Sequence, residues 1–95
     1  MRSVIESPIA MDAVDDAKER WARAEDAWAH LFWVLSRDPT VGFPLVEGGH
    51  LRSLVFDGSQ AHEMPTIDVV YEITEKNIII QRARFRDASS SAGSA

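Results

Sequence analysis

The spacing of hydrophobic residues divides this chain into two parts with different periods. Between residues 8 and 35, apolar side chains recur at alternating steps of four and three residues, at Ala10, Val14, Ala17, Trp21, Ala24, Trp28, Leu31 and Leu35. This spacing predicts a helix with one buried stripe. Ser7 and Pro8 are typical of a helix start, because serine caps the first turn and proline fits the first helical position. We therefore expect a helical segment over residues 8–37.

The length of this segment leaves two arrangements open. A continuous helix over 28 residues would be roughly 42 Å long, whereas a globule of this size is only about 30 Å across. Either the helix breaks into a hairpin near residues 22–26, or one end projects and packs on another chain. In the first case the stripe packs on the protein's own sheet. In the second, Trp21, Trp28 and Trp33 are the candidate partner-binding residues.

The second half of the chain alternates with period two, which is typical of strands. We expect one short strand near residues 2–7, before the helix, and three more at residues 50–56, 66–74 and 77–86. Residues 36–49 contain two prolines and three glycines, which indicates a connector. The expected order is one strand, a helix or helical hairpin, and then a three-stranded antiparallel meander. This order predicts an α+β domain with helices on one face of the sheet.

We expect residues 1–88 to form this single domain. The tail, residues 89–95, is small and polar, and we expect it to be disordered.

The last strand carries arginine at every other position. Strand alternation places Arg82, Arg84 and Arg86 on one face and Ile79, Ala83 and Phe85 on the other. A two-residue loop would pair Val69 with Arg82. A three-residue loop would instead give the pairs Ile67–Phe85, Asp68–Arg84 and Val70–Arg82. We prefer the longer loop, because it gives one apolar and one charged face.

The arginines allow two interpretations. Arg84 and Arg82 would neutralise Asp68 and Glu72 on a solvated face, and such pairs contribute only about 0.2–1 kcal/mol. Alternatively, the arginines form a binding surface, which Arg52 would enlarge if it lay on the same face.

Composition excludes several classes of function. The chain has no cysteine, so disulfides, thiolate zinc sites and cysteine nucleophiles are excluded. A formal net charge of −5 argues against a dedicated nucleic-acid binder, although it does not exclude a local basic patch. The sequence carries no nucleotide-binding or hydrolase motif, and His50, His62 and Glu63 match no metal-ligand spacing. We expect no cofactor, no metal and no membrane association, and, since no signal peptide is visible, a cytoplasmic location.

One stretch resembles a known family. Residues 65–85, PTIDVVYEITEKNIIIQRARF, are similar to the strand, turn and basic last strand of the RelE/ParE toxins of bacterial type II toxin–antitoxin systems, the plasmid stabilisation family. DPTVGFPL (38–45) and LRSL (51–54) resemble the connector and second strand of the family. Tyr71 matches a tyrosine of its strand, whereas Asp68 stands at an arginine position and Phe85 at the position of a catalytic acid or base.

The resemblance implies a toxin-like protein that acts on messenger RNA at the ribosome or inhibits gyrase without catalysis. The alternative is a catalytically degenerate protein-interaction module of the same fold. Whether the chain is an enzyme stays open; as a ribonuclease it would use Arg82 and Arg84 for catalysis. Phosphate would be bound by Arg52, Arg82, Arg84 and Arg86. The expected partner is a cognate antitoxin or a second copy of the chain.

Overall fold

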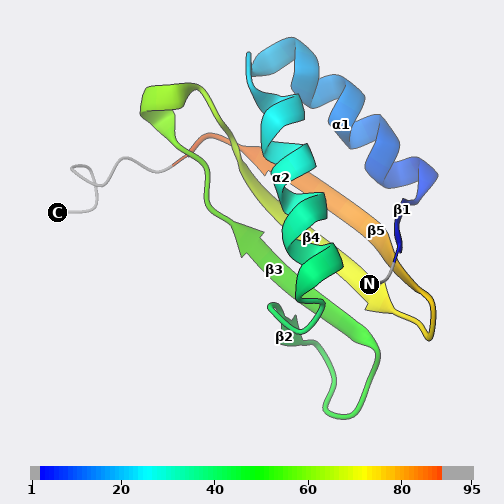
Figure 1. Cartoon of the computed structure of the whole chain (residues 1–95). Helices are drawn as coiled ribbons and strands as arrows, with labels where there is room; N and C mark the ends of the chain where they lie inside the picture. The colour runs from blue at the N-terminus through cyan, green and yellow to red at the C-terminus, as the bar shows by residue number, and fades with distance from the viewer. Residues whose placement is uncertain (1–2, 89–95) are drawn as a thin grey trace, which may run out of the picture.

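A computed structural model describes residues 3–88 and shows an α+β architecture (Figure 1). The elements are, in order, β1 (Ser3–Glu6), α1 (Pro8–Arg20), α2 (Ala24–Arg37), β2 (Phe43–Pro44), β3 (Leu51–Phe56), a 3-10 turn (Gln60–His62), β4 (Thr66–Ile73) and β5 (Asn77–Arg86). The five strands form one sheet in the order β1-β5-β4-β3-β2. β1 runs parallel to β5, and the other neighbours are antiparallel. The expected class and the adjacent β3, β4 and β5 are confirmed, while β2 is an addition.

The helical segment is a hairpin, the first of the two expected arrangements. α1 ends at Arg20 and α2 begins at Ala24. Trp21 leaves the helix in an extended conformation, packs its ring 6.4 Å from that of Phe85, and donates its indole N–H to the Asp87 carboxylate at 3.0 Å. The predicted stripe is buried along both helices except at Trp21. The segment therefore folds back on its own sheet.

The core lies between the two helices and one face of the sheet. α2 crosses this face, and α1 runs beside β5 (Figure 1). The core side chains come from both helices and from β4 and β5: Ala10, Val14, Ala27, Trp28, Leu31, Leu35, Ile67, Val69, Tyr71, Ile78 and Ile80. Trp28 is only 6% exposed, and its indole N–H donates to the Glu6 carboxylate.

A β-bulge interrupts the β4–β5 ladder. On one side of it, the preferred pairs Ile67–Phe85, Asp68–Arg84 and Val70–Arg82 are confirmed. The register shifts between Val70 and Tyr71, and Tyr71 then pairs with Ile80, which is the register of the shorter loop. Gln81 is the extra residue on β5. Each of the two alternative registers thus describes one half of the hairpin.

The bulge decides which residues of β5 face the core. Ile78 and Ile80 are fully buried and Ile79 is half-buried on the opposite face, so the expected core position of Ile79 is wrong. Strict alternation would put Arg82 on the same side as Ile78 and Ile80. The extra residue reverses the phase, so Arg82 and Arg84 point away from the core.

Ser7 stabilises this point of the sheet. Its backbone N–H donates to the carbonyl of Ile80 at 3.0 Å, and its hydroxyl donates to the carbonyl of Gln81 at 2.8 Å. The hydroxyl oxygen of Ser7 also accepts a hydrogen bond from the Ala10 N–H at 3.2 Å, which confirms Ser7 as the N-cap of α1. One residue thus fixes both the start of the helix and the bulge.

Candidate functional site

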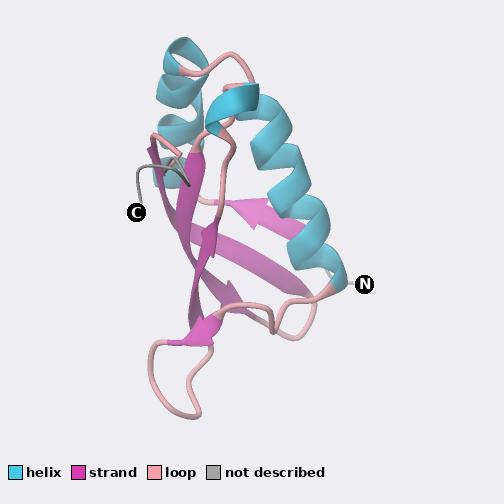
Figure 2. Cartoon of the chain, turned by 90° about the vertical axis from the view of Figure 1, so that its left-hand side faces the viewer, coloured by secondary structure: helices cyan, strands magenta, loops and turns pink. Residues whose placement is uncertain are grey.

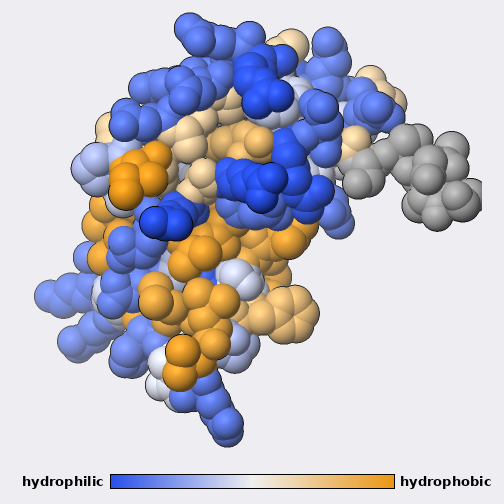
Figure 3. Space-filling model, turned by 180° about the vertical axis from the view of Figure 1, so that it is seen from behind, coloured by the Kyte–Doolittle hydropathy of each residue, from blue (hydrophilic) through white to orange (hydrophobic). Residues whose placement is uncertain are grey.

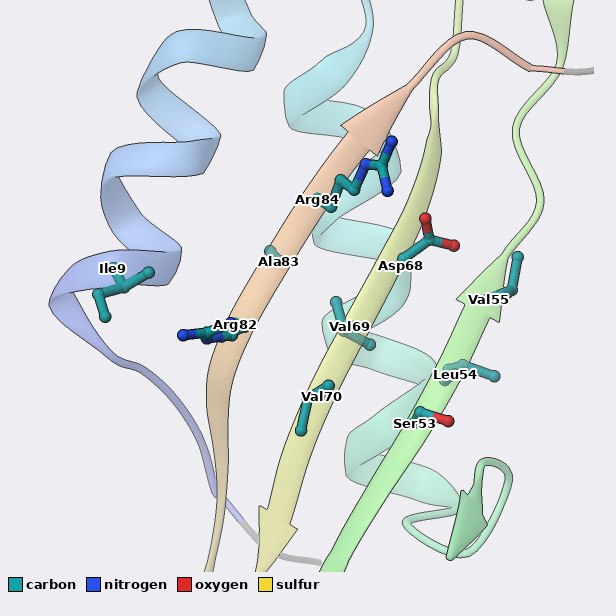
Figure 4. A pocket seen from close by; sticks show the side chains of 10 residues that line it. All are labelled: Ile9, Ser53, Leu54, Val55, Asp68, Val69, Val70, Arg82, Ala83 and Arg84. Carbon is teal, nitrogen blue, oxygen red and sulfur yellow. The ribbon is translucent and has the colours of Figure 1, made fainter. Parts of the chain in front are cut away.

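The face of the sheet opposite the core is the candidate site, and we call it the open face. Its central residues come from three neighbouring strands: Ser53, Val55, Asp68, Val70, Arg82 and Arg84. With Ile9 at the start of α1, they line a hollow of about 520 Å³ (Figure 4). Arg82 points toward Ile9, while Asp68 and Arg84 lie on adjacent strands. The hollow therefore combines aliphatic walls with two guanidinium groups.

The carboxylates of this face have other partners than expected. Asp68 accepts two hydrogen bonds from Arg86, from Nε at 2.9 Å and from an Nη at 3.3 Å, and this ion pair raises the pKa of Arg86. Glu72 accepts the side-chain amide of Gln81 at 3.1 Å. Of the two interpretations of the arginines, the one in which Arg84 and Arg82 neutralise these two carboxylates is therefore wrong.

As a result, two arginines are free. Arg82 and Arg84 are exposed, and neither has a hydrogen-bond or ion-pair partner within residues 3–88. They are two residues apart on one strand, so their Cα atoms are roughly 6.6 Å apart. Each guanidinium is therefore available to an anionic ligand without displacement of a carboxylate of the described residues.

Arg52 is not part of the open face. It pairs with Tyr71, whose side chain lies in the core, so Arg52 points to the helix side of the sheet. Its guanidinium donates to the carbonyls of Gly42 at 2.7 Å and Thr40 at 3.3 Å. Arg52 therefore holds the connector instead of enlarging the arginine cluster.

Tyr71 anchors the same connector. Its buried hydroxyl accepts the Gly42 N–H at 3.0 Å and donates to the Pro39 carbonyl at 2.7 Å. Burial raises the pKa of Tyr71, which keeps the hydroxyl protonated. A Cβ at Gly42 would lie 2.5 Å from the Ser53 carbonyl oxygen, so only glycine fits there. Tyr71 thus has a structural role.

The three tryptophans differ in accessibility. Trp28 belongs to the core, and Trp21 is half-buried against Phe85. Trp33 is 57% exposed on α2, with the Arg37 guanidinium 4.8 Å from its ring centroid. Of the three candidate partner-binding residues, only Trp33 presents a large surface to solvent.

No histidine or tyrosine is among the described residues that line the hollow. His50 lies near Glu72 and Glu75 in a separate hollow, and the His62 ring is hydrogen-bonded to Ser59 in the 3-10 turn. Phe85 faces the core, with its ring 5.5 Å from that of Trp28. The described lining of the hollow thus contains two arginines and one carboxylate, Asp68, as its charged groups.

A second feature, which the sequence pattern did not reveal, extends the open face. β2 and β3 form a hairpin, residues 43–51, whose apolar side chains are exposed: Phe43, Leu45, Val46 and Leu51. We call it the apolar hairpin. Figure 2 shows its loop curving away from the side of the sheet that α2 covers. The available signal was the apolar run Phe43-Pro44-Leu45-Val46 within a connector that is otherwise rich in glycine.

The apolar hairpin and the hollow are continuous. Phe43 pairs with Ser53, so one cross-strand row runs through Phe43, Ser53, Val70 and Arg82. From behind, Figure 3 shows hydrophobic side chains gathered over the lower part of this face and a hydrophilic cluster above them. The surface thus has an apolar end and a basic end.

Comparisons with known proteins give no match: no family model, no curated protein and no solved structure is significantly similar to this chain. Among the described residues, no helix has the length and hydrophobicity needed to cross a bilayer.

Proposed function

We propose that this protein is a toxin-like binding module that acts through its open face without cleaving RNA. The observation that carries the proposal is the pair of free guanidinium groups, Arg82 and Arg84, beside an aliphatic hollow. Free cations next to apolar walls suit a protein segment that carries both carboxylates and aliphatic side chains.

Catalysis has less support. Phosphodiester cleavage gains from charge stabilisation, which Arg82 and Arg84 can supply, but also from proton transfer. Phe85 cannot transfer a proton, and the one carboxylate in the hollow, Asp68, is engaged by Arg86. Binding therefore fits this geometry better than hydrolysis does.

RNA is the second candidate ligand, because two arginines on one strand also suit phosphates. Single-stranded RNA is commonly bound on aromatic platforms, whereas the walls of the hollow come from Ile9, Val55 and Val70. Within the toxin–antitoxin hypothesis, this comparison favours a protein target such as gyrase, or an antitoxin, over messenger RNA.

Induced expression in a bacterial host tests the proposal. We expect growth inhibition with intact messenger RNA, and we expect the double variant Arg82→Glu/Arg84→Glu to abolish the inhibition. Arg37→Glu reverses the charge of an exposed residue on α2 and is the matched control, for which we expect unchanged inhibition. Messenger cleavage that disappears in Arg84→Ala would instead establish a ribonuclease.

A direct binding measurement separates the ligand classes. Fluorescence anisotropy compares a peptide of alternating Glu and Leu, the same peptide with Lys for Glu, and an RNA oligonucleotide. We expect only the acidic peptide to bind, and the double variant to bind it at least about tenfold more weakly. Preferential RNA binding would contradict the proposal.

A further inference from the structure

We propose that the open face also binds a second copy of this chain, in a two-fold dimer. In this dimer the apolar hairpin of each copy lies over the Arg84 end of the other copy's open face. The inference goes beyond the proposed function, because it needs no ligand other than the chain itself.

The first argument is the exposed apolar surface. Phe43 is 77% and Val46 66% exposed, and Leu45 and Leu51 on the same hairpin are also exposed. The hairpin continues into the hollow through the row that links Phe43 to Val70. Large apolar side chains that are exposed side by side, and not singly, are typical of an interaction surface.

The second argument is the distribution of charge. A two-fold interface uses the same patch on both copies, so the patch must be complementary to itself. Glu47 stands at the tip of the apolar hairpin and Arg84 at the other end of the open face. Both are exposed, and neither has a polar partner among residues 3–88.

These positions define the symmetry. A two-fold axis that lies in the plane of the interface, perpendicular to the line from Glu47 to Arg84, exchanges the two ends of the patch. It brings Glu47 of each copy toward Arg84 of the other, and it stacks the central aliphatic side chains. Each dimer then contains two equivalent Glu47–Arg84 contacts.

The apolar hairpin has a tight turn at its tip and a very short first strand. The Gly49 N–H donates to the Val46 carbonyl at 2.9 Å, and Gly48 has a φ of +76°, so the tip is a tight turn. Its strand β2 is only two residues long and contains Pro44, which lacks an N–H. Edge-to-edge strand pairing through β2 is thereby disfavoured, whereas face-to-face contact is left open.

Charge reversal combined with sedimentation analysis of the full chain tests the dimer. We expect the wild type to dimerise with concentration. Glu47→Arg and Arg84→Glu should each weaken the dimer at least about tenfold, because both contacts then place like charges together. Glu25→Arg and Arg37→Glu on α2 are the matched controls, with unchanged association expected.

The decisive step is to mix the two variants. A heterodimer of Glu47→Arg with Arg84→Glu has two contacts between opposite charges, so mixing should restore association close to that of the wild type. Circular dichroism of each variant verifies the fold.

Three results would overturn the inference: a wild type that is monomeric at every concentration, single variants that dimerise normally, or a mixture that stays monomeric. Dissociation by Trp33→Ala but not by Arg84→Glu would assign the interface to α2. The dimer and the proposed function fail separately, because a wild type that stays monomeric can still bind the acidic peptide and inhibit growth through Arg82 and Arg84.

Discussion

Arg86, and not its neighbour Arg84, holds the Asp68 carboxylate, although Arg84 is the residue directly across the ladder. The ion pair is diagonal, because Arg86 is paired across the ladder with Thr66 and reaches back toward Asp68. Neutralisation of Asp68 by Arg86 leaves Arg84 available to a ligand.

This relationship predicts that Arg84 and Arg86 contribute differently to the stability of the fold. Arg84→Ala should change the free energy of unfolding by no more than about 0.5 kcal/mol, as exposed substitutions usually do. Asp68→Asn and Arg86→Ala should both lower the urea midpoint, and the double variant should lower it no further than either single one. Equal effects of Arg84→Ala and Arg86→Ala would contradict the assignment.

Arg52 should behave as a structural residue. Arg52→Ala removes the donors to the Gly42 and Thr40 carbonyls and should cost about 1 kcal/mol of stability. Arg82→Ala, an arginine on the opposite face, is the matched control and should have almost no effect on the urea midpoint. Peptide binding should show the reverse order: weakened by Arg82→Ala and unchanged by Arg52→Ala.

Tyr71→Phe should destabilise the fold by about 1–3 kcal/mol, because it leaves the buried Gly42 N–H without an acceptor. The ring is retained, so the core stays filled. Urea denaturation measures the change, and the slope with denaturant should match the wild type. An unchanged midpoint would show that water replaces the hydroxyl.

Alkaline pH should weaken the fold through the same residue. The raised pKa of Tyr71 means that the native state keeps a proton that the unfolded chain releases near a pKa of about 10. The free energy of unfolding should therefore fall as pH rises above about 10. Tyr71 is the only tyrosine of the chain, so tyrosinate absorbance reports on it alone. Ionisation of the folded protein at the pH of free tyrosine would contradict this prediction.

Deletion of the bulge residue Gln81 and deletion of Ala83, which follows the bulge, should differ sharply. Without Gln81, Ile80 is followed by Arg82 in strict alternation, so every side chain of β5 keeps its face. The cost should be about 1 kcal/mol for the lost contact with Ser7. Deletion of Ala83 would turn Arg84 into the core and should abolish cooperative thermal unfolding. Similar melting of the two variants would refute the phase argument.

Local patterns predicted much of this fold. The three- and four-residue spacing identified the buried stripe, and Ser7 with Pro8 identified the helix start, because both depend on neighbours along the chain. The alternation within residues 66–86 gave the correct pairing of Asp68 with Arg84. Each of these features depends on residues that are close in the sequence or that are joined by one short turn.

What could not be predicted depends on contacts between distant segments. No glycine or proline marks the break at Trp21, which leaves the helix to reach Phe85 and Asp87. The face of the sheet on which Ile79 lies depends on the β-bulge, and the extra residue of the bulge, Gln81, is hydrogen-bonded to Ser7. The face of Arg52 depends on the register between β3 and β4, which no local pattern in the chain predicts.

The position of β1 has a consequence for how the chain is made. The first strand lies beside the last, and Ser7 is hydrogen-bonded to Gln81, which is 74 residues further along the chain. During synthesis, β1 therefore has no strand to pair with until β5 has been translated. Ile78 and Ile80, which complete the core, also arrive late. The domain must then fold nearly all at once when its last strand emerges, and its N-terminal half should be vulnerable to proteolysis until that moment.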